Sequence, residues 1–171
     1  MPLFYPPAPT PQFIGTEPVG VAGALTILLT ANQVYLYLFE VPPTGMTILG
    51  TKWRMGATIG GTTNMGIYTY AGNLVAGSDT GAQTNTANSN MTFTYATAVF
   101  LPGGSYYIAL APSNATDTYE GITAPAGGPI LSRSRAATNV LAAGALPATT
   151  GAITTSGTKV PGAALQVSGG I

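Results

Sequence analysis

Ionisable side chains are scarce in this chain of 171 residues. Five Lys and Arg, five Asp and Glu and no His leave 6% charged residues and a formal net charge of zero. A soluble domain ordinarily has about 25% charged residues. Binding to nucleic acid requires a basic patch, and a membrane-surface helix requires a face rich in Lys and Arg. We therefore expect neither a nucleic-acid partner nor a membrane-surface role.

The absence of cysteine and histidine excludes much of enzyme chemistry. Without Cys the chain forms no disulfide and has no thiol nucleophile. Without His it lacks the commonest general base near neutral pH and the ligands of most zinc sites. No catalytic residue, cofactor or metal site is therefore assigned, and the protein is not expected to be an enzyme. One hydrolase alternative stays open, in which Glu40 and Glu120 face each other across a sheet as the two carboxylates of a glycosidase.

Apolar residues make up 46% of the chain, and Thr, Ala and Gly are also abundant. Disordered chains combine few apolar residues with a high net charge, so most of this chain should fold. Its few charges cannot cover a folded surface, which must then consist mainly of Thr, Ser, Asn, Gly and Ala. Such a surface suits a subunit that is buried against neighbouring copies. The alternative is a neutral domain that its hydroxyls and amides keep soluble.

Residues 1–18 are predicted to be an extended arm, because six of the 14 prolines fall there. Proline fixes φ and lacks a backbone N–H, so the segment should be polyproline-like rather than helical. Its apolar side chains would dock in a groove on the same subunit or on a neighbour, and a frayed terminus is the alternative. The candidate subunit-interface residues are Phe4, Tyr5, Phe13 and Ile14.

Residues 19–123 are predicted to form an all-β core. Short apolar or alternating segments recur there at the spacing of about 8–12 residues that is typical of antiparallel sandwiches and small barrels. Pro42-Pro43-Thr44-Gly45 is the clearest turn, because Pro presets φ and Gly allows a positive φ. The strands predicted in this core and near the C-terminus cover residues 25–30, 34–41, 47–58, 64–70, 73–77, 91–101, 106–110, 118–122 and 163–167.

The alternation within residues 47–58 assigns each side chain to one face of its strand. Leu49 and Trp53 fall on the side that should face the core, whereas Lys52 and Arg54 fall on the outside. This assignment makes Trp53 a core residue.

Two other segments each allow more than one structural interpretation. Residues 19–39 are uncharged and long enough for a membrane span. Asn32 and Gln33 interrupt them, so two strands joined by a turn are the better interpretation. Residues 124–171 are rich in Ala, Gly and Thr and are expected to return partly to the sheet, with a helical turn near residues 135–143.

Two features could contact a ligand. Residues 78–90 contain no apolar anchor and are predicted to be an exposed polar loop. Four tyrosines could form an exposed aromatic face for a sugar or another partner, although Tyr is also simply a good strand former. These candidate ligand-face residues are Tyr68, Tyr70, Tyr107 and Tyr119.

Residues 65–75 (MGIYTYAGNLV) and 101–110 (LPGGSYYIAL), with the polar loop between them, resemble jelly-roll modules of phage virion proteins, including head-decoration and fibre proteins. The resemblance covers roughly residues 34–115. It implies an antiparallel β-sandwich of jelly-roll type in the virion, which forms or decorates the capsid as a homo-oligomer in contact with other capsid proteins. The arm and the C-terminal segment would then clasp neighbouring subunits. The alternative is a carbohydrate- or receptor-binding module of a fibre, with a glycan as possible ligand.

Overall fold

The computed structural model describes residues 12–15, 25–29, 31, 33–123, 132–134, 146–153 and 159–168, and this part of the chain contains strands and no helix. The strands are β1 (Gln12–Gly15), β2 (Leu25–Leu28), β3 (Tyr35–Val41), β4 (Met46–Arg54), β5 (Thr62–Thr69), β6 (Gln83–Thr84), β7 (Asn90–Leu101), β8 (Gly104–Pro112), β9 (Thr118–Thr123), β10 (Ser132–Ser134), β11 (Lys159–Pro161) and β12 (Ala163–Val167). The predicted all-β class is confirmed.

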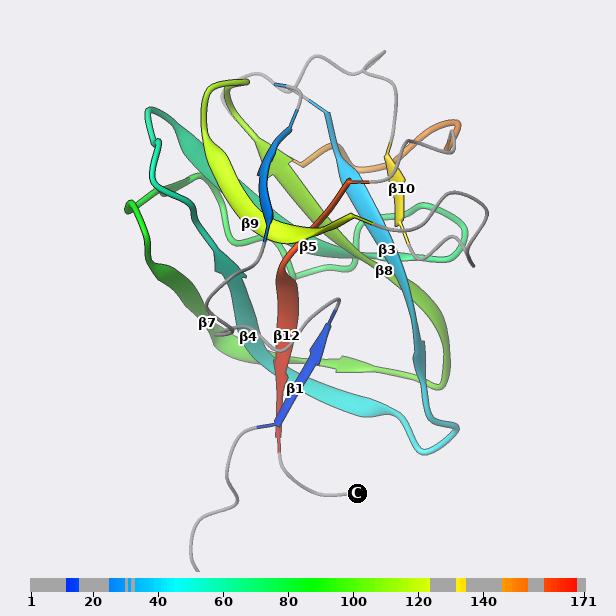
Figure 1. Ribbon diagram of the computed structural model, residues 1–171. Helices are drawn as coiled ribbons and strands as arrows, with labels where there is room; N and C mark the ends of the chain where they lie inside the picture. The colour runs from blue at the N-terminus through cyan, green and yellow to red at the C-terminus, as the bar shows by residue number, and fades with distance from the viewer. Residues whose placement is uncertain are drawn as a thin grey trace, which may run out of the picture.

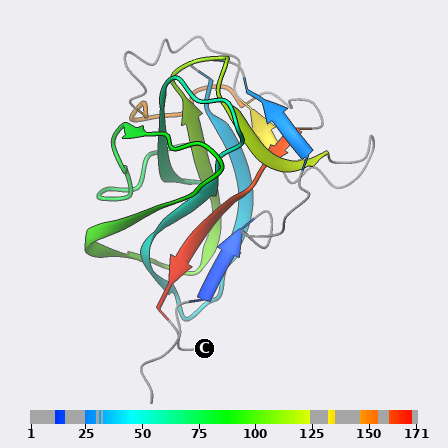
Figure 2. The same cartoon turned by 60° about the vertical axis from the view of Figure 1, so that its left-hand side comes forward.

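The strands form three antiparallel sheets within the described residues (Figure 1). A four-stranded sheet has the order β1-β12-β4-β7, and a five-stranded sheet has the order β10-β3-β8-β5-β6. The third sheet, β11-β9-β2, is small. Figures 1 and 2 both show β1, in blue, running beside β12, in red. The strand predicted at residues 163–167 is therefore present, as an inner strand of the four-stranded sheet.

The pairings are nested along the chain. β1 pairs with β12, β3 with β8, β4 with β7 and β5 with β6, so each pair lies in sequence inside the one before it. Two further pairings, of β12 with β4 and of β8 with β5, join these pairs side by side. The chain therefore runs as one long antiparallel ribbon that is folded over into the two larger sheets.

The two larger sheets share one hydrophobic core. Trp53 of β4 is its largest fully buried side chain, as the alternation of β4 predicts. The same cluster contains Tyr37 and Ile108 from the five-stranded sheet and Leu165 from the four-stranded sheet. Burial of apolar surface stabilises a fold by about 25 cal/mol per Å². This shared core is therefore what holds the two sheets together.

One assignment in β4 is wrong. Ile48 is fully buried in the core with Trp53, whereas Leu49 is only half-buried. The pairing of β4 with β12 skips Leu49, which makes it the extra residue of a bulge. A bulge interrupts the strict alternation of faces, so a pattern counted from Trp53 fails beyond it. Lys52 and Arg54, on the other side of the bulge from Ile48, are half-buried.

Within the described residues, the uncharged segment 19–39 contains β2 and most of β3. β2 pairs with β9 and β3 pairs with β8, so the two strands belong to different sheets. Within the described ranges, no helix is long and apolar enough to cross a membrane. The helical turn expected near residues 135–143 lies outside these ranges.

A second, smaller cluster covers the outer face of the five-stranded sheet. Leu36, Tyr68 and Tyr107 project there from β3, β5 and β8, and Leu146 packs on them. Gly66 of β5 allows this approach, because a Cβ at that position would collide with the Leu146 side chain. The sheet is therefore buried on both faces where this cluster lies.

Hydrogen bonds fasten residues 146–153 over this second cluster. The Tyr68 hydroxyl donates to the carbonyl of Pro147 at 2.6 Å, and the Thr150 N–H donates to the carbonyl of Gly72 at 2.8 Å. Gly72 has a φ of 86°, which a residue with a side chain rarely adopts. Residues 146–153, part of the C-terminal segment that is expected to clasp a neighbouring subunit, therefore pack on their own chain.

Tyr37 generates a prediction about pH. It is 1% exposed, and its hydroxyl has no hydrogen-bond partner among the described residues. Burial, with smaller contributions from Tyr35 and Tyr119, raises the pKa of Tyr37 well above its usual value. Such a group contributes stability that is complete below the unfolded pKa of about 10 and is lost as the pH rises toward the folded pKa. We predict that Tyr37→Phe makes the free energy of unfolding fall less steeply above about pH 10.

Urea unfolding followed by the fluorescence of the single Trp measures this effect. At neutral pH, Tyr37→Phe should raise the free energy of unfolding or leave it unchanged, because the hydroxyl that it removes makes no hydrogen bond. Tyr119→Phe is the matched control, because the Tyr119 hydroxyl lies 2.6 Å from Thr63 Oγ1 and its loss should cost about 1 kcal/mol. Equal losses in both variants would show that the Tyr37 hydroxyl has a partner.

Candidate functional site

The four candidate ligand-face tyrosines do not form one exposed surface. Tyr68, Tyr107 and Tyr119 are at most 2% exposed, whereas Tyr70 is 61% exposed. Tyr119 belongs to the main core, and the other two buried tyrosines belong to the second cluster. Residues 146–153 cover that cluster, so alternation alone could not reveal the burial. The predicted exposure is wrong for three of the four residues.

What remains of this face is a small apolar patch around Tyr70. The Tyr70 and Tyr107 rings are stacked, with centroids 5.8 Å apart and planes inclined by 13°. Leu38, which pairs with Tyr107 across β3 and β8, is 39% exposed. We call Leu38, Tyr70 and Tyr107 the tyrosine patch. It offers one accessible aromatic side chain supported by a buried one.

The candidate interface residues are only partly described. Phe4 and Tyr5 lie outside the described residues, and Phe13 lies in β1. Ile14 pairs with Leu165 and packs partly buried against the main core. The described part of the arm therefore docks on its own chain, as an added strand of the four-stranded sheet.

Residues 78–90 are only in part the exposed polar loop that the sequence predicts, since seven of the 13 residues are exposed and three are buried. Ser78 is fully buried, Thr80 is 5% exposed and Asn85 is 3% exposed. Within this segment, β6 pairs with β5. The prediction therefore fails for these three buried side chains, which form hydrogen bonds inside the molecule instead of facing solvent.

Two of these side chains satisfy the edge of β5. Ser78 Oγ accepts a hydrogen bond from the Ile67 N–H at 3.0 Å, and Thr80 Oγ1 accepts one from the Met65 N–H at 2.9 Å. The Tyr95 hydroxyl reaches from β7 and donates to the Ser78 carbonyl at 2.7 Å. The hydroxyls of Ser78 and Thr80, two residues apart, therefore accept the hydrogen bonds that the backbone of a longer β6 would otherwise accept from β5. The two-residue spacing of Ser78 and Thr80 is the feature of the sequence that could have indicated this role.

Asp117 joins three segments of the chain through hydrogen bonds. It is fully buried, and its Oδ1 accepts from the Gly60 N–H at 2.6 Å. Its Oδ2 accepts from Asn85 Nδ2 at 2.5 Å, and its own N–H donates to Asn114 Oδ1 at 2.9 Å. A buried charge is tolerated when it is hydrogen-bonded in this way. Because each carboxylate oxygen has a donor, the arrangement acts as a staple between loops.

The buried phenols of Tyr95 and Tyr119 are poorly suited to act as general bases near neutral pH. Burial raises the pKa of Tyr119, although its hydrogen bond with Thr63 lowers that pKa in part. Burial also raises the pKa of Tyr95, with a smaller contribution from Asp79. Both phenols therefore stay protonated in the pH range where a general base must accept a proton.

The structure gives Glu40 and Glu120 separate partners. Glu120 forms an ion pair with Arg54, with 2.9 Å between Oε2 and Nε. Glu40 Oε2 accepts a hydrogen bond from the Ser105 hydroxyl at 3.0 Å. The two carboxylates lie on β9 and β3, in different sheets. Within the part of the chain that the structure describes, no three Asp or Glu residues lie close enough together to hold a metal ion.

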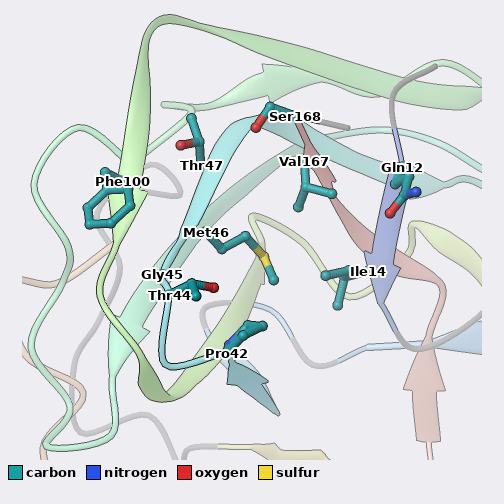
Figure 3. Close-up of a pocket in the computed structure, with 10 residues that line it drawn as sticks. All are labelled: Gln12, Ile14, Pro42, Thr44, Gly45, Met46, Thr47, Phe100, Val167 and Ser168. Atoms are coloured by element: carbon teal, nitrogen blue, oxygen red, sulfur yellow. The ribbon is translucent and has the colours of Figure 1, made fainter. Parts of the chain in front are cut away.

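A shallow pocket of about 260 Å³ opens where β1 meets the turn between β3 and β4 (Figure 3). Its apolar wall includes Ile14, Met46 and Val167, whose side chains converge in Figure 3, and the exposed ring of Phe100 lies at its side. Sites for small molecules usually have about 300–1,000 Å³ and a few polar groups that fix orientation. This pocket is smaller and has no charged residue in its wall.

The hydroxyls at the edge of β5 generate a prediction about stability. Thr80→Val keeps the shape of the side chain but leaves the Met65 N–H without this acceptor, and Ser78→Ala does the same to Ile67. An unsatisfied buried donor costs about 1–3 kcal/mol, so each variant should lose that much free energy of unfolding in urea. Thr84→Val, at an exposed position of β6, is the control and should change it by less than about 0.5 kcal/mol. Equal effects at all three positions would contradict the assignment.

Comparison with known proteins found no family model that matches the chain and no curated protein that is similar to it in sequence.

Proposed function

We propose that this protein is a structural subunit of a virus particle, in which it forms or decorates the capsid through contacts between subunits. Its fold would be an antiparallel β-sandwich of jelly-roll type, an architecture that viral capsid domains use. A jelly roll is a ribbon of strand pairs whose successive pairs alternate between two sheets. The pairs β1·β12 and β4·β7 in one sheet, with β3·β8 and β5·β6 in the other, support this assignment.

The observation that carries the functional proposal is the scarcity of charge on the folded surface. Of the six charged residues whose burial is described, only Glu40 and Asp79 are exposed. Asp117 is buried, and Arg54 and Glu120 pair with each other. Charged residues are depleted at the centre of protein interfaces, and a free surface normally has many more of them. The composition of this surface therefore favours burial against other subunits.

The exposed side of β7 supports the same conclusion. Its outward residues include Thr92, Thr94, Ala96 and Ala98, none of which is charged. Phe100, at the end of this row, is 60% exposed. Small uncharged side chains beside one large apolar ring can pack closely against another protein surface.

Assembly of the purified chain tests the proposal. We expect light scattering to give a mass that rises with concentration to a defined oligomer. Electron microscopy should show the protein in particles, or bound to shells assembled from the coat protein of the same genome. A chain that stays monomeric at high concentration and does not bind such shells would overturn the proposed function.

A second candidate function is carbohydrate or receptor binding at the tyrosine patch. The observation that favours it is the exposed Tyr70 ring stacked on Tyr107, because aromatic faces with one accessible ring can bind the apolar side of a sugar. We expect Tyr70→Ala to weaken binding on a glycan array about tenfold, which corresponds to about 1.4 kcal/mol. Tyr70→Phe is the matched control and should keep most of the binding. An array on which the unaltered protein binds no glycan rejects this candidate.

A further inference from the structure

One edge of the four-stranded sheet is formed by a long strand. β7 forms that edge and is 12 residues long (Figure 1). The other edge strands of the described sheets, β1, β2, β6, β10 and β11, have two to four residues each. Natural proteins protect exposed edges by keeping strands short or by placing charges or Pro on them. β7 is long and contains neither a charged residue nor Pro.

Two contacts establish which backbone groups of β7 point toward β4. The Ser89 carbonyl accepts a hydrogen bond from the Met55 N–H at 3.0 Å. The Phe93 carbonyl lies directly against Gly50 of β4. Along a strand, the N–H and C=O of one residue point to the same side, and those of the next residue point to the opposite side. Residues 89, 91 and 93 therefore direct their backbone groups to β4.

It follows that Asn90, Thr92 and Thr94 direct their N–H and C=O groups away from the sheet. No hydrogen bond joins these groups to any other described residue. Their side chains are also exposed, on the outer face of the sheet. The first half of β7 therefore presents a row of unpaired donors and acceptors, which is a template for another strand.

We propose that this edge pairs with β7 of a second copy of the chain, antiparallel, about a two-fold axis at Thr92. The Thr92 residues of the two copies would then face each other, and Asn90 would face Thr94 of the partner subunit. Each facing pair would exchange two N–H···O bonds, and the two four-stranded sheets would become one continuous sheet. The contact is isologous, so it closes as a dimer and does not continue as a fibre.

The chemistry of the strand identifies a second copy as the occupant. Every outward pair in this register joins Thr with Thr or Asn with Thr, and such pairs are favourable across strands. No charge lies on either side of the axis, so two identical strands do not repel each other. Met91 and Phe93, on the other face, are only half-buried and would lie close to the Phe93 and Met91 side chains of the partner subunit. Their remaining apolar surface would gain cover on dimerisation.

The proposed contact between two β7 strands does not depend on the proposed function. Only its use within a virus particle rests on that function. Two double variants test the contact itself. In the proposed register, Asn90→Glu with Thr94→Glu brings like charges together twice, whereas Asn90→Glu with Thr94→Lys brings opposite charges together twice. Both contain the same change beside Arg54 of β4, and Thr94 lies opposite Gly50, which has no side chain. The two variants therefore differ only in the sign of one charge at the edge.

Analytical ultracentrifugation should show that the Glu/Glu variant dimerises at least about tenfold more weakly than the unaltered chain, because facing like charges are costly. The Glu/Lys variant should recover the dimer. Circular dichroism confirms that both are folded, and Thr84→Lys controls for a charge placed elsewhere. Thr92→Pro is an independent variant that removes one outward N–H and leaves the pairing with β4 intact, and it should also weaken the dimer.

Hydrogen exchange gives a second measurement. The Thr92 and Thr94 amides should become protected as concentration rises, while the Met91 and Phe93 amides are protected throughout. Equal dissociation of the Glu/Glu and Glu/Lys variants, or dimers unaffected by Thr92→Pro, would overturn the proposed contact. If dimers require residues 1–11 and tolerate Thr92→Pro, exchange of arms is the contact instead. If the proposed contact fails in either of these ways, assembly of the unaltered chain into particles would still support the proposed function. Failure of the contact is therefore distinguishable from failure of the function.

Discussion

Satisfaction of backbone hydrogen bonds at strand edges is the constraint on which the rest of this structure depends. An unsatisfied buried donor costs about 1–3 kcal/mol, and net stabilities of domains are only about 5–15 kcal/mol. The nested pairing satisfies the inner strands. β5 is different, because its outer neighbour β6 has only two residues. The hydroxyls of Ser78 and Thr80 complete that edge, and the Tyr95 hydroxyl holds the segment that contains them.

The scarcity of charge connects this constraint to the surface. Charged side chains ordinarily do two separate things, since they keep surfaces soluble and they prevent edge strands from pairing with other chains. Among the described residues, Asp117 is buried in the interior and Arg54 and Glu120 form an ion pair, so little charge remains there for either purpose. Association with other subunits would resolve both problems together, because it buries neutral surface and pairs the free backbone groups.

Local patterns predicted most of the longer strands, but they missed the short strands β1, β6, β10 and β11, and residues 73–77 contain only isolated bridges instead of the predicted strand. Distant contacts explain the other errors. Period-two alternation placed Trp53 in the core, because it depends on side chains within one segment. The strand predicted at residues 163–167 is also present. Leu49 was assigned to the wrong face because the bulge arises in its pairing with β12. Tyr68 was predicted to be exposed because its cover comes from Pro147 and its neighbours, 79 residues away in sequence. Hydrophobicity also could not show that Ser78 and Thr80 replace a strand.

The two larger sheets are closed to different degrees. The five-stranded sheet is covered on its outer face by residues 146–153, and hydroxyls complete its β5 edge. The four-stranded sheet has β1 at one edge and the long, uncharged β7 at the other. Gln12, the first residue of β1, pairs with Val167, the last residue of β12. Contacts between subunits, as proposed above, would therefore be most favourable along the four-stranded sheet, because among the described residues its long edge strand β7 has unpaired backbone groups, whereas the other sheet has already used its polar side chains internally.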